Sequence, residues 1–138
     1  MANGSGTVLG GRGNFQNGEY IFKMDDASAS THNLEWNDSG KTFLVHSTVA
    51  RTINLPAPKA GVTYKFILTD TTADSPIAAT GNLILGGVEA GDAYLTLAGT
   101  TIICEAAASV GDNIAFISDG TNWYVSGHTA HDAGFSVT

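Results

Sequence analysis

Residues 62–69 read Val-Thr-Tyr-Lys-Phe-Ile-Leu-Thr, and this stretch decides the fold class. Its apolar side chains recur at alternate positions: Val62, Tyr64, Phe66 and Leu68. Successive side chains of a β-strand point to opposite faces, so this period of two predicts a strand with one buried face. We expect the strand to lie centrally in a sheet, with Tyr64 and Phe66 in the core.

Residues 114–125 predict a β-hairpin. Two apolar runs, at 114–117 and 123–125, flank Ser118-Asp119-Gly120-Thr121. Asp-Gly between two such runs is the strongest short-range hairpin signal. Because strand side chains alternate, one of Trp123 and Tyr124 must point into the core.

The rest of the chain repeats the same kind of pattern. A period of two runs through 20–24 and through the odd positions from 43 to 55, and short apolar runs follow at 83–85, 94–97 and 101–104. The best helix candidate, 105–109, is barely one turn long. We therefore predict an all-β fold, a single β-sandwich or barrel of about seven to nine short antiparallel strands.

Both ends of the chain differ from this domain. Residues 1–18 are rich in glycine and show no apolar period, so we expect an extended N-terminal arm that does not bury enough surface to order itself. Beyond Met1, its sizeable apolar or charged side chains are Val8, Leu9, Arg12 and Phe15. We expect a β domain over 19–127 and, because 128–138 lacks a sustained period, a C-terminal tail there.

Composition limits the partners. The 138 residues carry 6 Lys and Arg against 13 Asp and Glu, a net charge of −7. This charge repels a phosphate backbone and an anionic bilayer, so we expect no nucleic-acid and no membrane partner. A single cysteine closes no internal disulfide, and no signal-peptide pattern opens the chain, so we expect synthesis in the cytoplasm.

Enzyme motifs are missing or incomplete. Gly40-Lys41-Thr42 resembles the end of a phosphate-binding loop, but Glu35 stands where that loop needs a glycine. His128 and His131 have a spacing that suits a metal, yet a structural site normally needs four ligands, so they are only weak candidates. Among the 13 Asp and Glu residues, no pair stands out as the two carboxylates that a glycoside hydrolase needs. We predict no enzymatic activity, no cofactor and no bound metal.

Aromatic side chains leave one binding alternative open. Trp36, Trp123 and Tyr124 are residue types that stack on sugars. At least one ring of the 123–124 pair belongs to the core, so only part of this aromatic content is available to a ligand. Carbohydrate binding therefore stays an alternative.

Two stretches carry a resemblance to a known class of proteins. The first reads DSGKTFLV at 38–45, RTINLPAPKAG at 51–61 and YKFIL at 64–68; the second reads VGDN at 110–113 and ISDGTNWYV at 117–125. They resemble the core and the closing hairpin of small virion proteins of tailed bacteriophages. Together they cover about residues 31–126 of this sequence.

The resemblance implies an all-β module of the capsid decoration, or cement, type, which is also found in tail-fibre and appendage proteins. It implies a structural role on the capsid surface of the virion, with the major capsid protein as partner. Decoration proteins of this kind sit at local three-fold positions, so we expect a homotrimer. We assign capsid binding to the arm. The alternative is a tail-fibre, head-fibre or other appendage module, with carbohydrate binding as one option.

Overall fold

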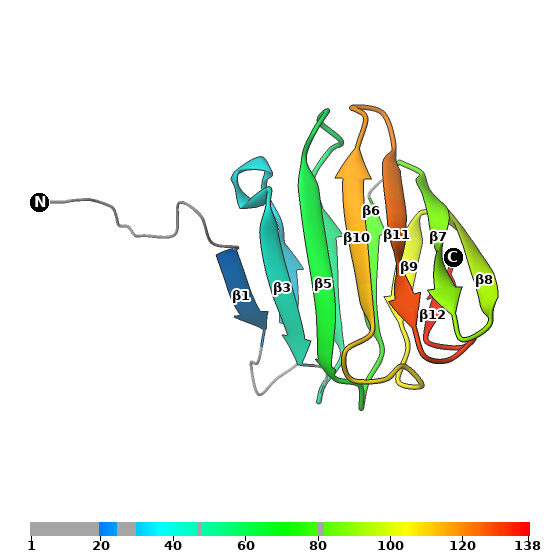
Figure 1. Cartoon of the computed structure of the whole chain (residues 1–138). Coiled ribbons are helices and arrows are strands. Elements are labelled where there is room, and N and C mark those ends of the chain that lie inside the picture. The colour runs from blue at the N-terminus through cyan, green and yellow to red at the C-terminus, as the bar shows by residue number, and fades with distance from the viewer. Residues whose placement is uncertain (1–19, 25–29, 47, 80–81) are drawn as a thin grey trace, which may run out of the picture.

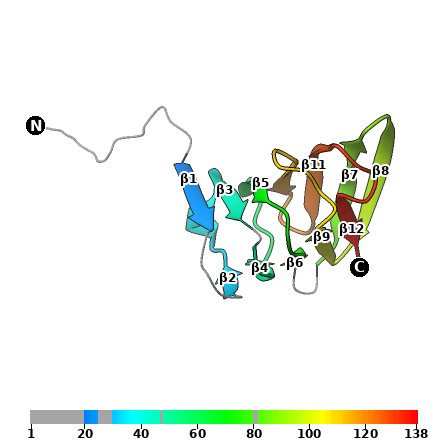
Figure 2. The same ribbon diagram turned by 90° about the horizontal axis from the view of Figure 1, so that it is seen from below.

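The computed structural model describes residues 20–24, 30–46, 48–79 and 82–138. These residues form two β-sheets that pack face to face (Figure 1, Figure 2). The larger sheet has seven strands, in the order β1 (Tyr20–Met24), β3 (Lys41–His46), β5 (Thr63–Asp70), β10 (Asn113–Ser118), β11 (Trp123–Thr129), β7 (Ile84–Ala90) and β8 (Ala93–Gly99). The smaller has five, in the order β12 (Phe135–Val137), β9 (Thr101–Cys104), β6 (Ser75–Ala79), β4 (Arg51–Leu55) and β2 (Ser30–Asn33).

The first half of the chain winds back and forth between the sheets. Strands β1, β3 and β5 run parallel to one another in the larger sheet. Strands β2, β4 and β6 run parallel in the smaller sheet. Each parallel pair is thus joined through a strand of the opposite sheet, which supplies the crossover that parallel strands require.

The all-β prediction is confirmed, but its details need correction. The described residues form twelve strands rather than seven to nine. Parallel and antiparallel pairs occur in both sheets, so a purely antiparallel arrangement was wrong. Both sheets have outermost strands, so the fold is not a closed barrel. Alternation along a strand predicts which face is buried but says nothing about the direction of its neighbour.

The central strand and the hairpin are confirmed. Strand β5 is an interior strand, paired with β3 on one side and β10 on the other. Strands β10 and β11 form the predicted antiparallel hairpin, with Ser118 opposite Trp123 beside the turn.

One hydrophobic core lies between the sheets. The larger sheet contributes an aromatic cluster that includes Phe43, Phe66 and Phe116. The smaller sheet contributes a row of isoleucines: Ile53 of β4 pairs with Ile77 of β6, which pairs with Ile102 of β9. All of these side chains are buried.

The last residues form part of the fold, in contrast to the expected tail. Strand β11 continues to Thr129, and β12 pairs with β9 in the smaller sheet. Phe135 is buried in the core. A strand of three residues is too short to show a period, which explains why the pattern did not reveal it. None of the described residues belongs to a helix long and apolar enough to cross a bilayer.

Candidate functional site

The predicted capsid-binding residues lie outside the described part of the chain. These residues are Val8, Leu9, Arg12 and Phe15. The segment that carries them joins the sandwich at β1, an outermost strand of the larger sheet. Their role therefore stays a prediction.

The predicted hairpin and core residues divide between the interior and the surface. Tyr64, Phe66 and Trp123 are buried. The ring centroids of Tyr64 and Trp123 are 5.6 Å apart, and Phe116 contacts Trp123 edge to face at 6.4 Å. Tyr124 points outward and is 39% exposed. Trp123 is thus unavailable for stacking on a ligand.

The hairpin motif that carries the resemblance folds into a self-supporting turn. Asp119 Oδ1 accepts hydrogen bonds from the N–H groups of Thr121, at 2.7 Å, and Asn122, at 2.8 Å. These bonds hold the pKa of the Asp119 carboxyl below its ordinary value. Gly120 has a φ of 99°, in the region that favours glycine. The motif therefore serves the turn and the core.

The two candidate metal ligands are surface residues. His128 lies near the end of β11 and His131 in the turn that follows, and both are exposed. The part of the chain that the structure describes holds no group of three or more side chains that suits a metal ion.

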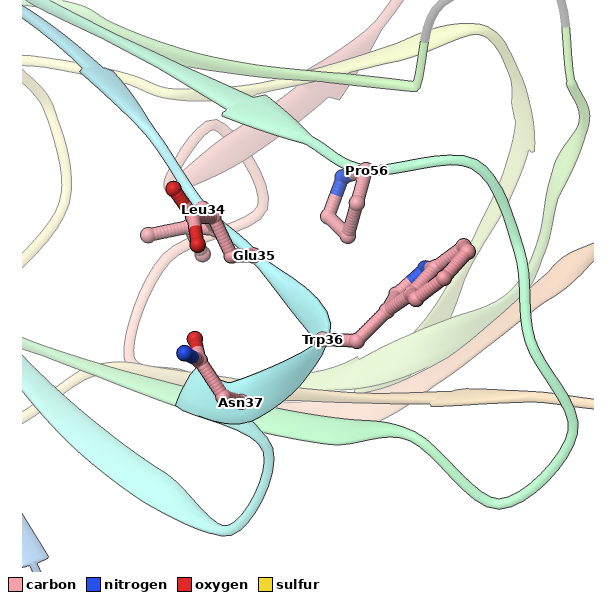
Figure 3. A pocket seen from close by; sticks show the side chains of 5 residues that line it. All are labelled: Leu34, Glu35, Trp36, Asn37 and Pro56. Carbon is pink, nitrogen blue, oxygen red and sulfur yellow. The ribbon is translucent and has the colours of Figure 1, made fainter.

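A hollow beside Trp36 is a candidate small-ligand site among the described residues. It has a volume of about 420 Å³ and lies where the chain leaves β2, passes through the short 3-10 helix η1 (Trp36–Asp38) and enters β3. Of the described residues, Leu34, Glu35, Trp36, Asn37 and Pro56 line it (Figure 3). Leu34 is buried, whereas Trp36 is 49% exposed.

The loop that carries this hollow is fixed at both ends. The buried Tyr64 donates a hydrogen bond from its hydroxyl to the carbonyl of Glu35, at 2.7 Å. Burial, aided by the charge of Asp38, raises the pKa of Tyr64 to about 12, so the hydroxyl keeps its proton. On the other side, Ser39 Oγ accepts a bond from the N–H of Thr63 at 3.0 Å.

Asp38 ties the loop to strand β3. Its Oδ2 accepts the N–H of Glu35 at 2.8 Å, and its Oδ1 pairs with Lys41 at 2.5 Å. Partial burial acts to raise the pKa of Asp38, but the Lys41 ammonium and the Glu35 N–H outweigh it and hold the pKa below its ordinary value. The carboxylate therefore stays ionised and the loop geometry is retained at neutral pH.

A second hollow of about 420 Å³ lies between the outermost strands β8 and β12. Apolar side chains dominate its lining, including Leu95, Leu97, Phe135 and Val137, and Glu105 and Asp132 also line it. Tyr94, at the start of β8, is 64% exposed. An apolar surface beside uncovered strand edges is typical of a protein-binding surface.

Trp36 stands out in the sequence as a residue type that stacks on sugars, but its neighbours in the hollow do not. Nothing in the sequence links Trp36 to Pro56, twenty positions further along the chain. The pairing of β2 with β4 brings the two segments together.

Comparison of the chain with protein families, with curated proteins and with solved structures finds no match.

Proposed function

We propose that this chain is a capsid decoration protein of a tailed bacteriophage. It binds the outer surface of the assembled head, where its partner is the major capsid protein, and bridges neighbouring capsid subunits. Its role is structural rather than catalytic, and its location is the virion.

The observation that carries the proposal is where the two stretches of sequence that resemble phage virion proteins lie in the fold. The first contains β3, β4 and β5, and the second contains β10 and β11. Strand β4 belongs to the smaller sheet, whereas β3, β5, β10 and β11 are consecutive in the larger sheet, although more than forty residues separate β5 from β10. Four of the five strands that carry the resemblance to phage virion proteins are therefore neighbours in one sheet, which supports a common fold.

The strand edges support a role in binding other proteins. Among the described residues, β1, β2, β8 and β12 each pair with a strand on one side only. An uncovered edge pairs readily with a strand from another chain. Residues 1–18 lead directly into β1, so an arm there starts at a sheet edge that a neighbouring capsid subunit can approach.

Co-sedimentation with undecorated capsids tests the attachment. We expect full-length protein to pellet with the shells and a chain lacking residues 1–18 to stay in the supernatant. Deleting the arm should leave the unfolding temperature of the sandwich nearly unchanged, because the arm has few apolar groups to add to the core. Equal pelleting of both proteins would place attachment on the sandwich instead.

We also propose that the isolated protein is a homotrimer. The apolar hollow between β8 and β12 and the exposed Tyr94 lie at one end of the sandwich, where a neighbouring copy is able to cover them. Light scattering after gel filtration should give three times the chain mass of 14.2 kDa. A strictly monomeric species at micromolar concentration would contradict the trimer.

The second candidate is an appendage module of a tail fibre or head fibre. The same hairpin motif occurs in such proteins, and the Trp36 hollow favours a protein that contacts a ligand on its own surface. Such a module should fail to pellet with undecorated capsids and should instead bind purified tails or fibres. The same co-sedimentation experiment therefore separates the two functions.

A further inference from the structure

The indole of Trp36 is exposed and yet held in one orientation. Its Nε1 donates a hydrogen bond to the carbonyl of Ala57 at 2.8 Å. The ammonium of Lys59 lies over one face of the ring, 4.7 Å from its centroid. Because the side chain is already ordered, a ligand that stacks on it loses little affinity to side-chain entropy.

The lining of the hollow combines apolar and polar groups. Leu34, Pro56 and the Trp36 ring provide apolar surface, and Glu35 and Asn37 add a carboxylate and an amide to the lining, on the side of the chain away from the Trp36 ring (Figure 3). A sugar ring has the same double character, since its C–H faces are apolar and its edges carry hydroxyl groups. Aromatic stacking combined with a few polar groups is the usual way to hold such a ligand.

The charge of the surroundings favours an uncharged sugar. Lys59 lies over the Trp36 ring, one carboxylate, that of Glu35, belongs to the lining, and Lys41 is paired with Asp38. The whole chain carries a net charge of −7. An acidic sugar would therefore meet no excess of positive charge in this hollow.

We propose that the Trp36 hollow is a binding site for a neutral carbohydrate. One pyranose ring stacks on the face of Trp36 opposite Lys59, and hydroxyl groups elsewhere on the same oligosaccharide bond to Glu35 and Asn37 across the hollow. The site goes beyond attachment to the capsid: a decoration protein with this site would also hold the particle at a glycan-bearing surface. Trp36 belongs to the sandwich, so sugar binding does not depend on the arm.

Tryptophan fluorescence gives a direct readout, because the chain has two tryptophans and Trp123 is buried. The full chain is titrated with maltose, cellobiose, lactose and chitobiose, and with sialyllactose as the acidic member of the panel. We expect at least one neutral disaccharide to change the emission of Trp36 and to protect it from iodide quenching. Calorimetry with the same disaccharide gives the affinity.

Substitutions then locate the site. Trp36→Ala should weaken binding by about tenfold or more, and Asn37→Ala by a few-fold. The matched control is Tyr94→Ala, which removes an exposed aromatic ring from β8 and should leave the affinity unchanged. Trp36→Phe keeps a smaller ring, so it should retain weak binding and serves if the alanine variant unfolds.

Three results would overturn the proposal. The first is an unchanged Trp36 fluorescence with every neutral disaccharide at about 10 mM. The second is an equal loss of sugar affinity in Tyr94→Ala and Trp36→Ala. The third is tighter binding of sialyllactose than of every neutral sugar. Pelleting of Trp36→Ala with undecorated capsids should match that of the unsubstituted chain. Failure of sugar binding is thus distinguishable from failure of the decoration function.

Discussion

Trp123 and Tyr124 are neighbours in β11 with opposite environments. Trp123 packs between Tyr64 and Phe116 and has no exposed surface, whereas Tyr124 lies on the outer face and donates from its hydroxyl to Asp119 Oδ2 at 3.0 Å. Two adjacent aromatic residues therefore contribute unequally to stability.

We predict that Trp123→Ala lowers the free energy of unfolding by about 3 to 5 kcal/mol, the range for truncating a buried large aromatic side chain. Tyr124→Ala should cost less than about 1 kcal/mol, because its ring is half in water and its hydrogen bond is exposed. Urea unfolding of the two variants measures the difference. Equal and small losses would mean that the end of the hairpin is peripheral to the core.

Cys104 and Tyr64 make stability depend on alkaline pH. Burial, with the charge of Glu105 acting in the same direction, raises the pKa of the Cys104 thiol from 9.0 to about 12. Burial likewise raises the pKa of Tyr64 from 10.0 to about 12. Both groups therefore hold their protons more tightly in the folded chain than in the unfolded one.

The raised pKa values of Cys104 and Tyr64 make the folded chain less stable as the pH rises. The stabilisation is fully present below pH 9, where both groups are protonated in either state, and is lost as the pH rises from 9 towards 12. We predict that the free energy of unfolding falls over this window and that Cys104→Ala makes the fall shallower. Urea unfolding at a series of pH values measures the slope. An equal slope in both proteins would show that Cys104 does not contribute.

At the scale of elements, Asp112 links the turn before β10, the end of β11 and the turn that follows β11. It is buried immediately before β10. Its Oδ2 accepts bonds from Thr129 Oγ1 at 2.7 Å and from the N–H of Ser109 at 2.8 Å. Its Oδ1 accepts the N–H of Ala130 at 3.0 Å. This one side chain thus joins the start of β10 to the end of β11 and the turn beyond it.

We predict that Asp112→Ala lowers the free energy of unfolding by about 2 to 4 kcal/mol, because it removes the acceptor of one buried and two part-buried hydrogen bonds. The matched control is Asp92→Ala, in the exposed turn between β7 and β8, which should change stability by less than about 0.5 kcal/mol. Thermal or urea unfolding tests both. A loss at Asp112 no larger than that at Asp92 would mean that the three bonds contribute little.

The sequence predicts single elements better than it predicts their partners. The alternation at Tyr64 and Phe66 and the Asp119-Gly120 turn depend on local chemistry, so β5 and the β10–β11 hairpin were predictable. The short segment between His46 and Arg51 has the length of a hairpin loop, yet there the chain crosses to the other sheet. No local pattern distinguishes these two outcomes.

The same limit applies to the candidate site. Trp36 was identifiable as an aromatic residue of a type that stacks on sugars. Its contacts with Ala57 and Lys59 arise only when β2 and β4 pair, because these residues follow a different strand. Long-range pairing therefore builds the hollow, and a single sequence does not reveal it.

At the scale of the whole molecule, the sandwich separates two roles. The strand edges and the segment that leads into β1 serve attachment to protein, in our proposal, whereas the Trp36 hollow lies in the crossover between β2 and β3. Attachment to protein and sugar binding then use different residues. Substitutions that alter one of these activities should therefore leave the other intact.

Heating of undecorated capsids with and without the protein tests the central claim, that the chain stabilises an assembled shell. A protein that binds only the intact shell stabilises it in proportion to the logarithm of its own concentration above the dissociation constant. We predict that the temperature of shell disruption, followed by light scattering, rises as full-length protein is added and does not rise with a chain lacking residues 1–18. A disruption temperature that full-length protein leaves unchanged at every concentration would contradict the account.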